Sequence, residues 1–168
     1  SYPPLQFNYS YNRDQVDAEF DQYTVYAAND GTTVTLYYDE SKNWCMSSAR
    51  AYDLTNMKPR GLDKSHGEAV REVLAHYDMT FDDLDKSVCY TIGFHHPVFH
   101  PFNDGISAWF IAAFNLEDLA EVQNTTKLPN QVVKEMQSFD QILSSANSAL
   151  HDWRNGKAPR YGFILCCD

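Results

Sequence analysis

The chain has 168 residues, of which 43% are hydrophobic and 14% aromatic, so it is long and apolar enough to bury a sizeable core. Its 23 Asp and Glu residues outnumber its 13 Lys and Arg residues, and the resulting net charge of −10 disfavours nucleic acid as a partner. No apolar run approaches the roughly 18 residues of a membrane span, and no signal peptide is recognisable, so we expect a soluble, cytoplasmic protein with no membrane partner.

The first 20 residues mix Pro, Tyr, Asn and Asp without a clear period, which predicts an N-terminal arm over residues 1–20. Residues 21–168 contain no repeat or linker and are expected to form a single α+β domain. The arm carries aromatic residues of the kind that anchor protein interfaces, namely Tyr2, Phe7, Tyr9 and Tyr11. We expect this arm to bind a protein partner or a second copy of the chain, or else to pack back on the domain's own sheet.

Three strands are predicted next, over residues 25–28, 33–38 and 44–50. The first two flank the triplet Asn-Asp-Gly at 29–31, which is typical of a hairpin turn, so they are expected to pair with each other. The third follows a polar turn at 39–43 and would extend the same antiparallel meander. Residues 51–63 hold a proline and a glycine and are expected to form a loop.

The segment that follows predicts a helix and two strands. Ser65 and Glu68 have the spacing of a capping box, and apolar residues then recur at helical intervals as far as Tyr77. A short acidic segment at 81–85 predicts one further turn. Residues 88–95 are rich in β-branched and aromatic side chains and are expected to form a buried strand, and residues 107–114 another.

The C-terminal part predicts the longest helix and a last strand. Pro129 stands where the first turn of a helix tolerates proline, and Gly156 is a stop signal after a long apolar face. A strand over 160–166 ends the chain. The element order is β-β-β-α-β-β-α-β, which predicts an α+β fold with a twisted, mainly antiparallel sheet, one long C-terminal helix and one shorter helix.

Three imidazoles lie within six positions of one loop, at His95, His96 and His100. Such a cluster is a candidate zinc or copper site, although its spacing matches no standard zinc motif. Two prolines, Pro97 and Pro101, and several aromatic residues lie among and beside the histidines. They also favour a packed corner in which each ring nitrogen finds a backbone partner.

Four short segments occur in the order of a known family. They are Asp30-Gly31-Thr32, Ser47 to Arg50, Cys89 to Phe94, and Tyr161 to Leu165. In this order the chain resembles the RNA ligase-like nucleotidyltransferases of bacteriophages and large DNA viruses. The resemblance implies a nucleotidyltransferase-like fold, a virus-encoded protein in the host cytoplasm or the virion, and nucleotide-binding residues at Asp30, Gly31, Thr32, Arg50 and Gly162.

The reactive residues of that family have no counterpart here. In the family, a lysine two residues before Asp-Gly attacks the α-phosphate of ATP, and two glutamates on later strands help to hold the ribose or the metal. The lysine position falls on Ala28, the middle-strand acid near Gly93, and the late acid on Tyr161. An alanine methyl group cannot attack phosphorus, and the loss of both carboxylates removes charge that would hold a divalent cation. We therefore assign no catalytic residue.

Three hypotheses follow. The first is a non-catalytic relative of the RNA ligase-like adenylation domain that acts as a binding or assembly component and needs no cofactor. The second is an active nucleotidyltransferase or nucleotide-binding enzyme with relocated groups, using Lys42, Lys58 or Lys64 with Arg50 on phosphate, and depending on ATP and Mg²⁺. The third is a metal-binding protein that uses the three histidines of the loop.

Overall fold

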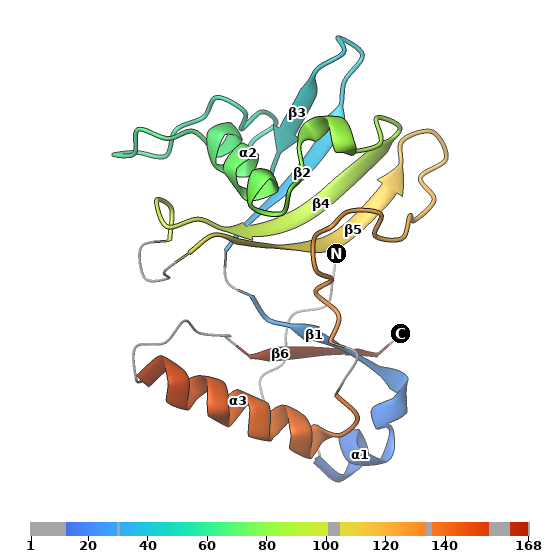
Figure 1. The fold of residues 1–168 in the computed structure, drawn as a ribbon. Coiled ribbons are helices and arrows are strands. Elements are labelled where there is room, and N and C mark those ends of the chain that lie inside the picture. The colour runs from blue at the N-terminus through green and yellow to red at the C-terminus, as the bar shows by residue number, and fades with distance from the viewer. Residues whose placement is uncertain (1–12, 30, 101–104, 134–135, 155–161, 168) are drawn as a thin grey trace. The chain divides into compact units, whose positions relative to one another are not determined.

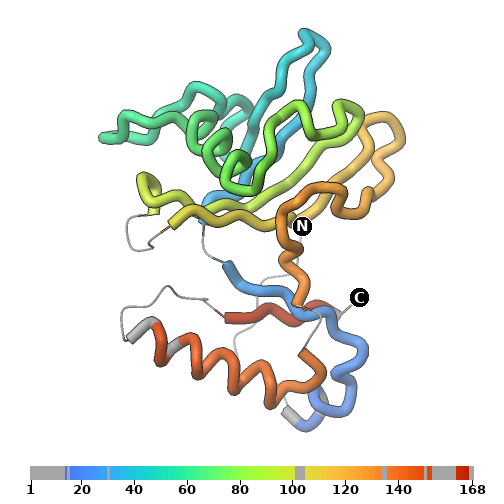
Figure 2. The backbone as a smooth tube through the Cα atoms, in the orientation of Figure 1, coloured from blue at the N-terminus to red at the C-terminus, as the bar shows by residue number. Residues whose placement is uncertain are grey.

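The computed structural model describes residues 13–29, 31–100, 105–133, 136–154 and 162–167 (Figure 1). The chain divides into two compact units. Unit 1 joins the two ends of the chain, up to Ala28 and from Val132 onward, whereas unit 2 is the continuous stretch Asn29–Gln131. The backbone path through each unit can be followed in Figure 2. Segments on both sides of unit 2 pair with each other within unit 1.

Unit 2 is built on a four-stranded antiparallel sheet with the order β3-β2-β4-β5. Its strands are β2 (Thr32–Tyr38), β3 (Trp44–Ser47), β4 (Val88–His95) and β5 (Ser107–Asn115), and its helices are α2 (His66–His76) and the short 3₁₀ helix η3 (Phe81–Asp83). These strands, the helix and the acidic turn confirm the sequence predictions for residues 33–114, with β3 ending three residues earlier than expected.

The core of unit 2 lies between α2 and one face of the sheet. Alternate residues of the central strands point to that face, because successive side chains of a strand lie on opposite sides. On β4 they are Tyr90, Ile92 and Phe94, each at most 1% exposed. They belong to one hydrophobic cluster with the apolar face of α2, which presents Ala69, Val70, Val73 and Leu74. Burial of this face, more than helix propensity, holds α2 in place.

The predicted capping box at the start of α2 is present. The Ser65 hydroxyl accepts a hydrogen bond from the backbone N–H of Glu68 at 3.2 Å, and the Glu68 carboxylate accepts one from the backbone N–H of Ser65 at 2.7 Å. Two N–H groups that a helix would otherwise leave without partners are thereby satisfied.

Unit 1 holds a two-stranded antiparallel sheet and the longest helix of the described chain. Its elements are α1 (Arg13–Ala18), the 3₁₀ helix η2 (Phe20–Gln22), β1 (Tyr23–Ala27), α3 (Phe139–Arg154) and β6 (Phe163–Cys167). In the sheet, Val25 pairs with Leu165. The predicted arm thus includes α1 in its last part, and the aromatic residues Tyr2, Phe7, Tyr9 and Tyr11 lie outside the described residues.

The predicted hairpin between the first two strands is wrong. β1 pairs with β6 in unit 1, and β2 pairs with β3 and β4 in unit 2, so the two strands belong to different sheets. The turn signal at 29–31 has another physical basis. Gly31 packs so closely that an added Cβ would meet the carbonyl oxygen of Phe94 and lie 2.7 Å from the indole of Trp109. The glycine is required by this close approach to the sheet.

The predicted start of the long helix at Pro129 is also wrong, since α3 begins ten residues later. The segment at Pro129 pairs with the edge of β5, where the Phe110 N–H donates to the Pro129 carbonyl at 2.8 Å and the Gln131 N–H donates to the Phe110 carbonyl at 3.1 Å. The helix starts after Ser138, whose hydroxyl accepts from the Gln141 N–H at 3.3 Å. This Ser-x-x-Gln spacing is a capping signal in the sequence that the apolar pattern from Val132 onward obscured.

No helix within the described ranges is long and apolar enough to cross a membrane.

Candidate functional site

The structure brings predicted nucleotide-binding and metal-binding residues together at one end of the unit 2 sheet. Thr32 opens β2 and pairs with Phe94, which stands directly before the histidine loop on β4. The Thr32 hydroxyl lies 3.3 Å from Nε2 of His100. We call the group of Thr32, Glu72, His95, His96 and His100 the histidine corner.

His96 is the most enclosed member of the histidine corner, at 3% exposure. Its Nδ1 accepts the backbone N–H of Val98 at 3.2 Å, and its Nε2 lies 2.9 Å from a carboxylate oxygen of Glu72. Because Nδ1 acts as an acceptor, we assign the ring hydrogen to Nε2, which donates it to Glu72. Both nitrogens of a buried ring are therefore satisfied.

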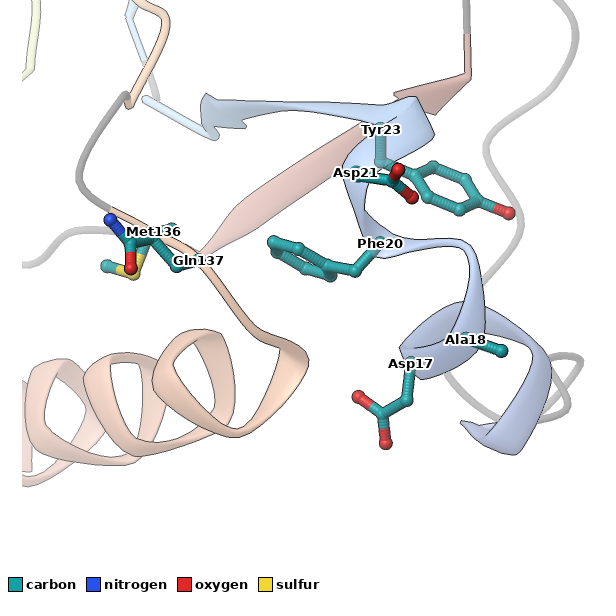
Figure 3. Close-up of a pocket in the computed structure, with 7 residues that line it drawn as sticks. All are labelled: Asp17, Ala18, Phe20, Asp21, Tyr23, Met136 and Gln137. Carbon is teal, nitrogen blue, oxygen red and sulfur yellow. The ribbon is translucent and has the colours of Figure 1, made fainter.

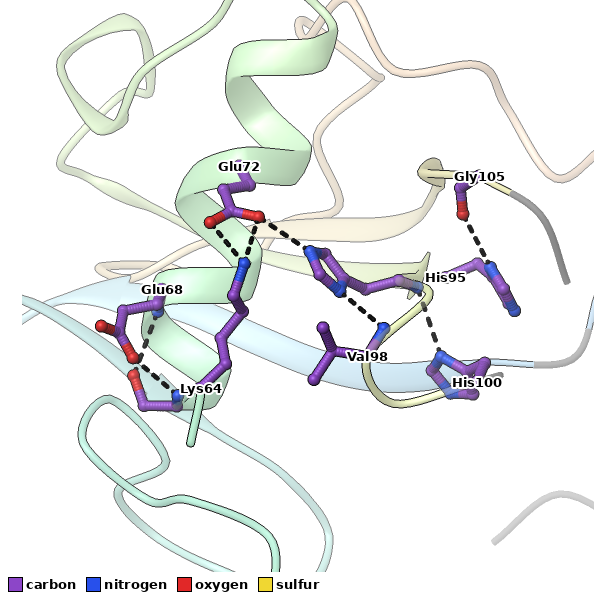
Figure 4. Close-up of polar contacts among 9 residues, drawn as sticks. Lys64, Glu68, Glu72, His95, Val98, His100 and Gly105 are labelled. Atoms are coloured by element: carbon purple, nitrogen blue, oxygen red, sulfur yellow. Dashed lines mark hydrogen bonds and ion pairs between the residues drawn. The ribbon is translucent and has the colours of Figure 1, made fainter. Parts of the chain in front are cut away.

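Glu72 joins this ring to a cation. It projects from α2, and both of its oxygens lie 2.5 Å from Nζ of Lys64 (Figure 4). The hydrogen bonds from Lys64 and then from His96 lower the pKa of Glu72 below its ordinary value, so the carboxylate is ionised at neutral pH. Its side chain is 47% exposed, and solvent therefore screens the ion pair.

His95 and His100 complete the histidine corner. Nδ1 of His95 donates to the carbonyl oxygen of Gly105 at 3.1 Å, and Nδ1 of His100 accepts the backbone N–H of His96 at 3.3 Å (Figure 4). The two rings lie 4.6 Å apart between centroids. All three Nδ1 atoms thus have backbone partners, which is the packed corner that the prolines and aromatic residues favoured.

The same geometry bears on the metal hypothesis. No group of three or more His, Cys, Asp or Glu side chains in the described part of the chain is arranged to hold a metal ion. A metal ligand needs an unprotonated nitrogen directed at the ion. In His95 and His96 the Nδ1 atoms face backbone groups, and Nε2 of His96 faces Glu72.

The other predicted nucleotide-binding residues belong to different parts of the chain. Arg50 is exposed at the tip of a tight turn, in which the Ser48 N–H donates to the Ala51 carbonyl at 2.9 Å. Gly162 lies in unit 1, where its carbonyl accepts the backbone N–H of Ala28 at 2.9 Å. Asp30 lies outside the described residues, and within unit 2 Gly31 and Thr32 adjoin the histidine loop.

The position nearest to the family's middle-strand acid has no room for a side chain. Gly93 pairs across the sheet with Trp109, and a Cβ built on Gly93 would collide with three atoms of the Trp109 indole. Trp109 is only 7% exposed, so the ring cannot move aside into solvent. A carboxylate at position 93 would require a different packing of β4 against β5.

A pocket of about 470 Å³ lies in unit 1, lined by Asp17, Ala18, Phe20, Asp21, Tyr23, Met136 and Gln137. Phe20 points from one wall toward Met136 and Gln137 on the other (Figure 3). The charged lining residues are the acidic Asp17 and Asp21, which would repel the phosphates of a nucleotide. None of Gly31, Thr32, Arg50 and Gly162 lines this pocket.

Comparison with known proteins gives distant viral relatives. The chain is 28% identical over 199 residues to a protein named "Putative RNA-ligase" from African swine fever virus, isolate Tick/South Africa/Pretoriuskop Pr4/1996, covering 97% of this chain and 44% of that protein. It is 27% identical over 179 residues to the protein of the same name from isolate Pig/Kenya/KEN-50/1950, covering 85% of this chain and 40% of the relative. The chain is a distant, RNA ligase-like relative of these viral proteins.

This RNA ligase-like chain spans about two fifths of the length of the curated relatives that it matches. No family model matches it, and no solved structure matches it. The α+β architecture with antiparallel sheets agrees with the predicted fold class.

Two residues that shape the site have no local signal in the sequence. Glu72 is 24 positions from His96, and its role depends on how α2 packs beside the end of β4. Trp109 covers Gly93 only because β4 and β5 pair in one particular register. Such long-range relationships appear only once the strands are assembled.

Proposed function

We propose that this RNA ligase-like chain is a non-catalytic scaffold with a nucleotidyltransferase-like fold that serves a viral protein as a binding or assembly component. The observation that carries the proposal is the residue at position 28. A lysyl-nucleotide bond needs a primary amine there, and the chain has Ala28, whose methyl group has no nucleophilic character.

The neighbouring positions support the same proposal. Trp109 fills the space in which a side chain at position 93 would stand, and position 161 is a tyrosine. A divalent cation on a triphosphate is usually held by carboxylates, so their loss weakens any remaining metal chemistry. The scaffold therefore needs no cofactor.

Several lysines of unit 2 that could be considered as substitutes for the lost amine are engaged elsewhere. Nζ of Lys64 bonds to Glu72, Nζ of Lys86 lies 4.8 Å from the centre of the Tyr38 ring, and Nζ of Lys127 donates to the carbonyl of Asp78 at 2.6 Å. Each of these ammonium groups already makes a contact within the protein.

Charge favours protein as the partner class. A net charge of −10 repels nucleic acid, whereas aromatic residues near the N-terminus are typical interface anchors. We propose that the chain binds a protein partner or a second copy of itself in the host cytoplasm or the virion.

Labelling with nucleotide tests the proposal. The protein is incubated with α-³²P-ATP or α-³²P-GTP and Mg²⁺ and examined on a denaturing gel, beside an active RNA ligase as the positive control. We expect no label on this chain. We also expect none on the Ala28→Lys variant, because the acidic positions remain filled by Gly93 and Tyr161. Covalent label on the wild-type chain would overturn the scaffold proposal, and label on Ala28→Lys alone would show that position 28 by itself accounts for the missing activity.

The active-enzyme alternative rests on the name that the viral relatives carry and on Arg50, which is exposed at its turn. It requires ATP and Mg²⁺ to bind. A nucleotide titration with and without Mg²⁺ separates the two proposals, and under the alternative Arg50→Ala abolishes the binding. Arg60→Ala, at another exposed loop arginine, is the matched control.

Elemental analysis of the same preparation tests the histidine alternative, which requires stoichiometric zinc or copper.

A further inference from the structure

A second pocket lies in unit 2 and takes no part in the proposed function. Its volume is about 530 Å³. Its walls come from the β2–β3 turn, from β3 and the loop after it, and from α2 and η3. The residues that carry its chemistry are Asp39, Trp44, Cys45, Asp53, Arg71 and Phe81.

The pocket holds opposite charges that do not pair with each other. Arg71 projects from α2, one helical turn beyond Gly67 on the same wall, and it makes no ion pair with a described residue. Asp39 and Asp53 line the same pocket but belong to the turn and loop walls. Opposite charges left apart in one pocket suit a ligand that itself carries both charges.

The carboxylates are fixed in place by their own loops. Asp39 accepts the backbone N–H of Asn43 at 2.7 Å and the thiol of Cys45 at 3.5 Å. Asp53 accepts the backbone N–H of Thr55 at 2.8 Å, which lowers its pKa and keeps it ionised at neutral pH. Each carboxylate can accept further hydrogen bonds, because an ionised carboxylate offers about four acceptor sites.

The electrostatic potential at this side of the pocket is negative. Burial raises the pKa of the Cys45 thiol, and the nearby Asp39 and Asp53 raise it further. Tyr37, the cross-strand partner of Cys45, responds in the same way: burial raises its pKa first, and Cys45, Asp53 and Asp39 add to the effect. A thiol held protonated in this setting is a weak nucleophile, so the side chains favour binding over covalent chemistry.

Two aromatic rings supply an apolar wall. Trp44 and Phe81 stack with centroids 5.8 Å apart and an angle of 29° between the ring planes. The indole N–H of Trp44 is buried and has no acceptor among the described residues, so this wall also holds a hydrogen-bond donor without a partner. Flat apolar surfaces of this kind pack well against an aromatic or aliphatic side chain.

We infer that this pocket binds a small zwitterion of the amino-acid class, with its carboxylate on Arg71, its ammonium toward Asp39 and Asp53, and an apolar side chain against Trp44 and Phe81. Arginine binds carboxylates through two parallel hydrogen bonds, and an ammonium beside two carboxylates gains charge-assisted hydrogen bonds. The two charges of the ligand match the separated charges of the pocket, with Arg71 on one wall and Asp39 and Asp53 on the others.

Three probes that differ by one charged group test the inference: L-phenylalanine, phenethylamine, which lacks the carboxylate, and 3-phenylpropionate, which lacks the ammonium. Binding to the whole chain is measured by calorimetry. We expect saturable binding of phenylalanine that is about tenfold or more tighter than that of either analogue, since each lost charge-assisted contact is worth about one factor of ten.

Two variants identify the contacts. Arg71→Gln should weaken phenylalanine about tenfold or more and leave phenethylamine unchanged, and Asp53→Asn should weaken phenylalanine and leave 3-phenylpropionate unchanged. Asparagine at 53 still accepts the Thr55 N–H, so the loop keeps its bond. Arg60→Gln, at an arginine that does not line the pocket, should change nothing. No saturable binding of phenylalanine, equal affinity for all three probes, or unchanged affinity in Arg71→Gln would each overturn the inference.

Discussion

The indole of Trp109 lies over Gly93, its partner across the β4–β5 pair, in the space that a Cβ at position 93 would occupy. The same ring reaches Gly31, where an added Cβ would lie 2.7 Å from its Cη2 atom. The buried side chain of Trp109 therefore leaves no room for a side chain at position 31 or at position 93. The sheet face opposite α2 is shaped by this ring.

Gly93→Ala should destabilise unit 2, because the new methyl group collides with the buried ring of Trp109. We expect a loss of about 1–3 kcal/mol in the free energy of unfolding, as is usual for overpacking. Urea unfolding followed by tryptophan fluorescence measures it. In a Trp109→Leu background the same substitution should cost less, and an equal cost in both backgrounds would show that the two residues do not interact.

Ser65→Ala should weaken the start of α2. The substitution removes the hydroxyl that accepts the Glu68 N–H, and the loss of such a cap costs about 1 kcal/mol. Thermal unfolding followed by circular dichroism provides the measurement. Ser41→Ala, at an exposed serine of the β2–β3 turn, is the control and should leave the melting temperature unchanged. A shift as large in Ser41→Ala would show that the effect is not specific to the cap.

Acid should destabilise unit 2 through Glu68 and Glu72. The backbone hydrogen bond from Ser65 lowers the pKa of Glu68, and the hydrogen bond from Lys64 lowers that of Glu72, both from an ordinary value of 4.5. A carboxylate with a lowered folded-state pKa stabilises the fold above its unfolded-state pKa, and this contribution is lost as the pH falls below it.

The measurement is the urea midpoint at a series of pH values between about 3 and 7. Glu68 and Glu72 should change the midpoint little between about pH 7 and 5, and the midpoint should then fall as the pH is lowered further. Glu68→Gln and Glu72→Gln should each make the acid-side fall shallower, whereas Glu40→Gln, at an exposed turn residue, should not. A fall of the same steepness in all four proteins would refute the assignment.

His96→Phe should loosen the histidine corner. It removes the nitrogen that donates to Glu72 and the acceptor of the Val98 N–H, and the loss of a hydrogen bond costs about 0.5–1.5 kcal/mol. The loop after β4 should then be cut more readily by protease. His76→Phe, on the exposed side of α2, is the matched substitution and should leave cleavage unchanged. Equal resistance of wild type and His96→Phe would argue against a structural role for this ring.

Local signals predicted much of unit 2. The capping box at Ser65, the β-branched run of β4 and the polar turn before β3 act over a few residues, and each produced the expected element. Pairing was harder to predict. The strand after Tyr23 looks like half of a hairpin, yet its partner is β6, near the other end of the sequence. Periodicity carries no information about which distant strand will pair.

The histidine corner shows the same limit. The sequence placed three imidazoles in one stiff loop and offered both a metal site and a packed corner. The choice of partners depended on Glu72, which α2 brings to the loop, and on Thr32, which β2 brings. Neither neighbour is implied by the spacing of the histidines. The sequence therefore limited the histidines to two alternatives, a metal site or a packed corner, but could not decide between them.

The pairing of Tyr23 with Cys167 has a consequence for synthesis. Unit 2 is one uninterrupted stretch, so it can acquire its structure while the ribosome is still translating the remainder. The β1 segment emerges earlier, but its strand partner β6 becomes available only when Phe163–Cys167 has left the exit tunnel. During that interval an apolar strand is exposed to other nascent chains and to chaperones, and slower elongation before position 163 would prolong that risk.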